Sequence, residues 1–202
     1  MVSLTIDTLA TAARWDLAKV TSLPGRCRGD ALGRWGENLM RRFGADAHKR
    51  VQRRVGPPFD AVAPVLTVKD WVPVGAQLAL TEAIVDEFLG GDMRALYPLL
   101  LEDTRAGLGR LQVLAVKALG AGRVLARGAA GFRDIYERGT ADAQIDRGRA
   151  RITFRGSPLF AHPTWRLLQL FATRTVIELA GSPGQVSGEH LGEDAFATLA
   201  TW

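Results

Sequence analysis

The stretch 141–155 constrains the fold of this chain more than any other part, because its apolar residues fall at every second position. The pattern runs from Ala141 to Ile145, breaks at Arg147-Gly148, and resumes from Ala150 to Phe154. Successive side chains of a strand point to opposite faces, so each half predicts a strand with one apolar face. The glycine of the break predicts a tight turn. The polar faces, acidic in the first half and arginine-rich in the second, favour pairing of the halves as an antiparallel hairpin.

The residues after the hairpin predict a helix and two more strands. Trp165, Leu168 and Phe171 form an apolar stripe at helical spacing, which predicts a helix over 162–172. The run 174–179 is dense in β-branched residues and predicts a strand, and 195–202 alternates as the hairpin does. The glycine-rich, acidic stretch between these two strands predicts a loop. The order ββαββ indicates a four-stranded antiparallel sheet with one apolar face that other elements must cover.

The part of the chain before the hairpin is expected to be mainly helical and to supply that cover. Helical patterns extend over residues 3–20, 31–43, 47–55, 74–89, 106–119 and 123–136. Gly120-Ala121-Gly122 interrupts the last two of them. The fold class is therefore α+β, with N-terminal helices packed on a C-terminal four-stranded antiparallel sheet. At 202 residues we expect a single domain, with a mainly helical part, 1–140, and a sheet part, 141–202.

Composition and charge narrow the possible environment and partners. A single cysteine excludes an internal disulfide and a cysteine metal cluster. No apolar run is long enough to span a bilayer, and residues 1–13 lack the basic start of a secretory signal, so we expect a cytoplasmic protein. A net charge of +5 fits an anionic partner, but the excess is almost all arginine, which is typical of coding bias in a GC-rich genome. We therefore favour a solvated basic surface over binding to nucleic acid or to a membrane surface.

Short glycine and apolar motifs are spread along most of the chain. They are Pro24 with Arg28-Gly29, Leu96-Tyr97-Pro98, Gly107-Leu108-Gly109-Arg110, the stretch 119–125, the hairpin, and Thr201-Trp202. In this order they resemble a paralogous family of uncharacterised proteins from myxobacteria, a domain of unknown function. The resemblance covers nearly the whole chain. It implies no activity and no catalytic residue, because none is established for that family.

Helices followed by ββαββ are also similar in topology to vinyl-reductase-like domains, to trafficking-complex subunits of that fold, and to nitric-oxide-sensing haem domains. This similarity implies binding of a small hydrophobic ligand or of another protein rather than catalysis. The cysteines of the metal-binding vinyl-reductase-like domains are absent from the C-terminal half, and the Tyr-x-Ser-x-Arg signature of the haem sensors is absent from the sequence. The cofactor is therefore left unknown.

Residues able to carry chemistry are few and scattered. No histidine pairs with another metal ligand at helical or hairpin spacing, and the acidic residues around His190 are better explained by an exposed loop than by a metal site. His162 is a candidate axial ligand of haem, with a helix-terminus histidine as the alternative. Cys27 lies between two arginines, which favours a thiolate, but no base is assigned to it. Nucleophile-elbow, Walker and dinucleotide motifs are absent. We predict no catalytic residue and no metal site, which argues against an enzyme.

Three functions remain. The first is a non-enzymatic binding or signalling module that acts through protein–protein contact, as a homodimer or with a partner, with Trp35 and Trp71 at the interface. The second is a sensor of a small hydrophobic ligand, with haem as one candidate, in a pocket between helices and sheet. The residues predicted to bind that ligand are Gly107, Leu111, His162 and Trp165. The third and weakest is non-specific nucleic-acid binding by the basic run Arg41–Arg54.

Overall fold

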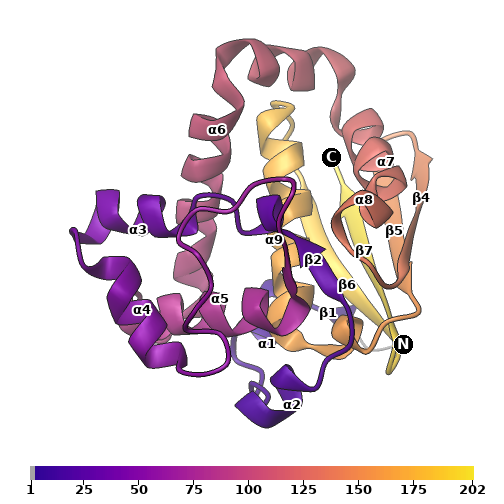
Figure 1. Cartoon of the computed structure of the whole chain (residues 1–202). Helices are drawn as coiled ribbons and strands as arrows, with labels where there is room; N and C mark the ends of the chain where they lie inside the picture. Colours follow the sequence, from indigo (N-terminus) through magenta and orange to yellow (C-terminus); the bar gives the residue numbers. More distant parts are fainter. Residues whose placement is uncertain (1–2) are drawn as a thin grey trace. The chain divides into compact units, whose positions relative to one another are not determined.

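The computed structural model describes residues 3–202 (Figure 1). These residues divide into two compact units. Unit 1 comprises residues 3–14, 97–133 and 139–202. Unit 2 comprises residues 15–96 and 134–138. The fold is α+β, as the sequence predicts, and helices pack on an antiparallel sheet of five strands rather than four.

The sheet belongs to unit 1 and has the strand order β1-β6-β7-β5-β4, with every neighbouring pair antiparallel. Its strands are β1 (Ser3–Leu4), β4 (Thr140–Asp146), β5 (Arg149–Arg155), β6 (Gln185–Gly192) and β7 (Ala195–Thr201). The predicted hairpin is confirmed. Asp146 pairs with Arg149, and Gly148 supplies the positive φ of 70° that the turn between β4 and β5 requires.

Two helices of unit 1, α7 (Ala121–Ala130) and α9 (Pro163–Leu179), lie side by side on one face of the sheet (Figure 1). Unit 1 also contains α1 (Ile6–Ala10), most of α6 (Leu96–Leu119) and the short 3-10 helix η3 (Pro158–Ala161). The short helix α8 (Phe132–Ile135) lies at the boundary between the two units in the sequence. Alternate residues of β5 and β7, such as Ile152, Phe154 and Phe196, point toward α7 and α9 and are buried, as the alternating sequence predicts. Thr153 and Ala197 on the opposite face are buried too, which the alternation does not predict.

An aromatic cluster forms the core of unit 1 between α9 and the sheet. The Trp165 ring lies 4.6 Å from the Phe160 ring and 5.0 Å from the Phe154 ring, measured between centroids. Phe132 and Phe196 complete the cluster, and Trp165 is fully buried. Edge-to-face and tilted rings at these distances add to the stability that comes from their large buried area.

The predicted strand 174–179 is wrong, because these residues are the second half of α9. Ile177 and Leu179 are buried and continue the apolar stripe that Leu170 and Phe171 begin at helical spacing. Tertiary packing of this stripe outweighs the strand propensity of the β-branched residues. The strand that fills the predicted place is β6, which lies in the stretch predicted to be a loop.

The predicted helix over 3–20 is also wrong. This stretch begins with β1, continues as α1, and then belongs to α2 (Leu17–Thr21) in unit 2. Each short helix has its own N-cap: the Thr5 hydroxyl accepts from the Thr8 N–H at 3.1 Å, and the Asp16 carboxylate accepts from the Lys19 N–H at 2.7 Å. A side chain that satisfies the free N–H groups marks a new helix start, so two starts exclude one continuous helix.

Unit 2 is built mainly from α3 (Trp35–Phe43), α4 (Ala47–Val55) and α5 (Val74–Phe88). These three helices confirm the predicted ones, although α3 starts four residues later than residue 31, after a 3-10 turn (η1, Gly29–Ala31). A two-stranded sheet, β2 (Arg26–Arg28) with β3 (Trp71–Pro73), was not predicted. Another 3-10 turn, η2 (Met93–Ala95), follows α5.

Glycines divide the helical region that precedes the hairpin. α6 is broken at Gly109, whose φ of 66° and ψ of 169° are not helical, and Gly120, at φ 77°, separates α6 from α7. The predicted interruption at 120–122 is therefore confirmed, whereas the helix predicted over 123–136 is split into α7 and α8.

Candidate functional site

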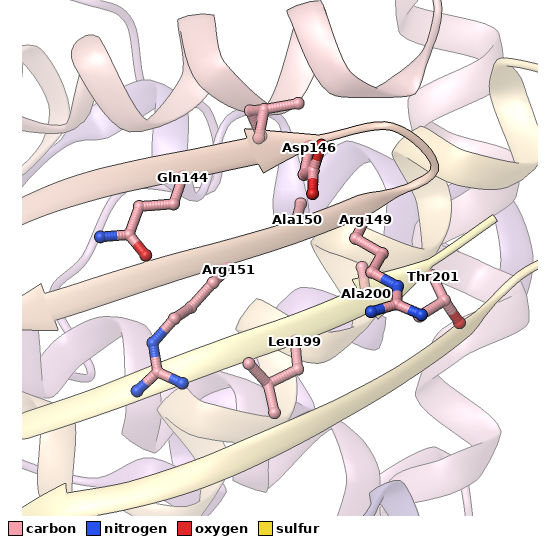
Figure 2. A pocket seen from close by; sticks show the side chains of 9 residues that line it. Gln144, Asp146, Arg149, Ala150, Arg151, Leu199, Ala200 and Thr201 are labelled. Atoms are coloured by element: carbon pink, nitrogen blue, oxygen red, sulfur yellow. The ribbon is translucent and has the colours of Figure 1, made fainter.

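Two grooves at the sheet of unit 1 offer room for a ligand. The first, which we name the sheet groove, has a volume of about 460 Å³ (Figure 2). Gln144, Arg151 and Leu199 project into it from the neighbouring strands β4, β5 and β7. By register these residues lie on the outer face of the sheet, which we define as the face opposite α7 and α9. Four of the nine lining residues are polar side chains of β4 and β5, namely Gln144, Asp146, Arg149 and Arg151, and the rest of the lining is mainly apolar.

An ion pair fixes one wall of the sheet groove. The guanidinium of Arg151 lies 2.5 Å from the carboxylate of Glu189, which is only 5% exposed. The two residues belong to β5 and β6, so the pair spans the intervening strand β7 on the outer face. A nearly buried carboxylate without a partner would destabilise the fold. The Arg151 charge therefore neutralises Glu189 and is less available to bind a ligand.

The second groove, which we name the edge groove, has a volume of about 550 Å³. It is lined by residues from helices α1 and α9 and from strands β6 and β7. Ile6 and Val186 give it apolar surface, and Arg174 gives it a cation. The guanidinium of Arg174 donates to Glu178 at 3.1 Å and lies 4.4 Å from the centre of the Tyr97 ring. Polar and apolar residues share its lining about equally, and its volume lies within the range of small-molecule sites.

Arg166 is a buried cation at the start of α9. Its Nε donates to the Phe160 carbonyl at 2.5 Å, and Nη2 lies 3.1 Å from Nδ1 of His190. Burial lowers the pKa of Arg166, because the charged guanidinium loses water. These contacts tie the first turn of α9 to β6 and to the 3-10 helix that precedes α9, so we assign Arg166 a positioning role in the fold of unit 1.

His162 does not fit the role of haem ligand that the sequence suggested. It is fully buried at the N-cap of α9, where the Thr164 N–H donates to its Nδ1 at 3.2 Å. A neutral imidazole that accepts at Nδ1 carries its proton on Nε2, so its Nε2 has no lone pair for iron. The alternative interpretation, a helix-terminus histidine, describes its contacts.

Two other potential iron ligands, Cys27 and Tyr97, are held in protonated forms. Burial raises the pKa of the Cys27 thiol to about 12, so it does not act as a thiolate near neutral pH. Burial, and to a smaller extent the nearby Glu178 carboxylate, raise the pKa of Tyr97 to about 12. The two grooves are lined by no histidine, cysteine, tyrosine or methionine. The residues at these places therefore do not fit haem ligation.

The metal cluster considered around His190 does not form among the described residues, where no three metal-binding side chains come together. His190 contacts Arg166, whereas its neighbour Glu189 pairs with Arg151. Adjacent strand residues point to opposite faces, so these two side chains cannot share one ion.

The residues predicted to bind a ligand are not brought together. His162 and Trp165 are fully buried in the packed core beside α9. Leu111 is 82% exposed on α6, and a Cβ at Gly107 would meet no atom within 4 Å. Ligand binding by these four residues stays a prediction. Sequence reasoning missed the edge groove, because two of its walls depend on β6 and on the short N-terminal elements.

The two tryptophans predicted at an interface have different environments in unit 2. Trp35 is buried, and its indole N–H donates to the Ala63 carbonyl at 2.8 Å. Trp71 is 40% exposed on β3. Their roles at an interface remain untested. The basic helix α4 uses part of its charge internally, since Arg50 pairs with Glu87 of α5 at 2.5 Å.

Comparison with solved structures shows an H-NOX-like fold. A structure from work on modulating haem redox potential through protein-induced porphyrin distortion has a TM-score of 0.57 at 10% identity, covering 87% of this chain and 99% of the other. An Fe(II) unliganded H-NOX protein mutant from K. algicida has a TM-score of 0.56 at 13% identity, covering 86% and 95%. No protein-family model and no curated protein matches the sequence. The resemblance to a myxobacterial family therefore stays a prediction.

Within residues 3–202, none of the helices combines the length and the apolar character that crossing a membrane requires.

Proposed function

We propose that this chain is a non-enzymatic sensor domain that binds a small, partly apolar ligand in the edge groove. The observation that carries the proposal is the H-NOX-like fold over 86–87% of the chain, since the structures that share it come from work on haem redox potential and on an Fe(II) H-NOX protein. A shared fold supports a mode of use and does not by itself assign a ligand. The ligand must therefore be argued from the groove.

The edge groove favours an amphipathic molecule with an anionic group. Ile6 and Val186 would cover its apolar part, and Arg174 would meet its charge. Arg174 is already oriented by Glu178 and by the ring of Tyr97, so little conformational entropy is lost when a ligand reaches it. Because α1 and α9 contribute to the walls, an occupied groove would stabilise these helices against the sheet edge. Ligand binding would thereby change the stability of α1 and α9, and this change is the signal that the domain would transmit.

Native mass spectrometry of the purified chain tests this proposal. We expect a bound species of small mass that is lost on denaturation. Val186→Trp should fill the groove and abolish the bound species. Gln144→Trp, which adds the same bulk to the sheet groove, is the matched control and should retain it. Equal occupancy in both variants, or a wild-type chain without any bound species after exposure to cell extract, would overturn the proposal.

Protein contact is the second candidate function, and Trp71 is the observation that favours it. An aromatic side chain that is 40% exposed on a short strand is typical of the residues that become anchors in interfaces. Analytical ultracentrifugation and pull-down with wild type and Trp71→Ala test this reading. It requires an assembly or a captured partner that the substitution weakens, and a strict monomer without a partner would remove it.

A further inference from the structure

The last part of α6 is an exposed helix that is separated from its neighbours by two glycines. We name residues 110–119 the arch helix, because it joins the upright part of α6 to α7 across the end of unit 1 (Figure 1). Gly109 and Gly120 bound it with positive φ values of 66° and 77°. These non-helical residues set the direction of the arch helix independently of the helices on either side.

The outward side of the arch helix is apolar. Leu111 is 82% exposed, Leu114 is 60% exposed and Leu119 is 49% exposed. Ala115 and Ala118 lie among them on the same side at helical spacing and are also exposed, while Val113 and Val116 occupy the less exposed opposite side. Burying one leucine is favourable by about 2 kcal/mol, so a stripe of this kind in water indicates a surface that is covered in use.

The charge of this region is of one sign. Between Thr104 and Arg133 the sequence contains no aspartate or glutamate, and it contains six basic residues, Arg105, Arg110, Lys117, Arg123, Arg127 and Arg133. Arg110 and Lys117 flank the apolar stripe along one edge, and both are exposed. An apolar helix face bordered by arginine and lysine is the pattern of helices that lie in the plane of an anionic membrane surface.

Other occupants fit this combination less well. A second copy of the chain would place the same basic residues of both helices near each other and would gain no charge compensation from this region. A nucleic acid would meet the charges, but it would leave the leucine stripe in water. A lipid surface satisfies both features, because acyl chains cover the leucines while anionic headgroups meet the bordering cations.

We propose that the arch helix docks the domain on an anionic lipid surface, with Leu111, Leu114 and Leu119 inserted and with Arg110 and Lys117 at the headgroups. The arch helix is distinct from the edge groove, so this proposal does not depend on the ligand proposed for that groove. Docking of this kind places a domain on a membrane without spanning it.

Flotation with lipid vesicles of two compositions tests the proposal on the full chain. We expect binding to vesicles of phosphatidylcholine mixed with phosphatidylglycerol and much weaker binding to phosphatidylcholine alone. Leu111→Gln with Leu114→Gln should lower the affinity at least about tenfold, because the inserted area is lost. Arg110→Gln with Lys117→Gln should lower it about thirtyfold and weaken the preference for anionic lipid. Raising salt from about 0.1 M to about 1 M should weaken wild-type binding, because the screening length falls from about 10 Å to about 3 Å.

Val68→Gln is the matched control, since Val68 is 57% exposed outside the arch helix and should leave binding unchanged. Circular dichroism verifies that each variant is folded, which is expected for exposed positions. Wild-type chain that fails to float with anionic vesicles overturns the proposal. Equal binding to both compositions overturns it too, as does a dimer dispersed by the leucine substitutions without any vesicle binding.

Discussion

Arg151 of β5 and Glu189 of β6 form an ion pair across the intervening strand β7, with 2.5 Å between the guanidinium and a carboxylate that is almost fully buried. Neither residue is close to the other in sequence, and only the order β6-β7-β5 brings them together. The pair shows how the outer face accommodates charge: an arginine from the hairpin covers an acid from the strand beyond β7. This relationship gives the first prediction.

Arg151→Met should lower the free energy of unfolding by roughly 2 kcal/mol, because it leaves the Glu189 carboxylate buried without its cation. The value lies below that of a fully buried pair because the Arg151 side chain is 36% exposed. Chemical denaturation measures it. Arg149→Met, on the same strand and exposed, is the control and should change stability by less than about 0.5 kcal/mol. Adding Glu189→Leu to Arg151→Met should restore most of the loss, and a double variant no better than the single one would contradict the account.

The second prediction concerns Arg166, which joins the start of α9 to β6. Arg166→Met should lower the free energy of unfolding by about 2 kcal/mol, since the buried Phe160 carbonyl loses its charged hydrogen-bond donor. His190→Lys should also destabilise the fold by placing a permanent cation against the guanidinium, whereas His190→Gln keeps an acceptor and should be milder. Thermal melts of the three variants decide this. Equal melting temperatures for the lysine and glutamine variants would show that the contact with His190 is not needed.

The third prediction tests the aromatic core of unit 1. Trp165→Ala should lower stability by about 3–5 kcal/mol, because a fully buried indole is replaced by a cavity among packed rings. Trp165→Phe should lower stability less than Trp165→Ala, since it keeps an aromatic ring in the cluster. Trp71→Ala, at a 40% exposed position, is the comparison and should be mild. Near-ultraviolet circular dichroism with urea unfolding makes the measurement, and a small effect of Trp165→Ala would mean that the core is elsewhere.

The fourth prediction follows from the Cys27 thiol, whose pKa is raised to about 12 by burial. The unfolded chain loses this proton above about pH 8.5, while the folded chain keeps it. Stability from this group is therefore complete below that pH and is lost progressively as the pH rises toward 12, with a slope of up to about 1.4 kcal/mol per pH unit.

Unfolding free energies of wild type and Cys27→Ala between about pH 7 and pH 10 test the slope. The variant has lower absolute stability, because a buried side chain is truncated. Its stability should nevertheless fall less steeply above pH 8.5 than that of wild type. Parallel curves would contradict the assignment. As a second readout, a thiol reagent should modify native Cys27 slowly and denatured chain rapidly.

Local patterns in the sequence predict much of unit 1 and most helices of unit 2. The hairpin is predictable because strict alternation and a glycine turn act over neighbouring residues, so register follows from the sequence alone. Helices α4 and α5 are predictable because their sequence patterns also act over neighbouring residues. The strand–helix confusion at 174–179 arises because β-branched residues favour strands locally, while burial of Ile177 in the core decides the outcome.

The candidate site is less accessible from sequence. Ile6, Arg174 and Val186 are far apart in the chain and meet only through the packing of α1 and α9 at the sheet edge. The N-cap role of His162 depends on which ring nitrogen faces the Thr164 N–H, and spacing alone cannot specify that. By contrast, the apolar side of the arch helix is visible in the sequence, but only its exposure distinguishes it from a core helix.

The proposed function is a sensor on an H-NOX-like fold that does not hold haem through His162. Titration of the purified chain with haem, followed by absorption spectroscopy of wild type and His162→Ala, tests it most directly. The account predicts the same spectrum for both proteins, with no band of histidine-ligated haem. A stoichiometric histidine-ligated Soret band in wild type that is lost in His162→Ala would contradict it.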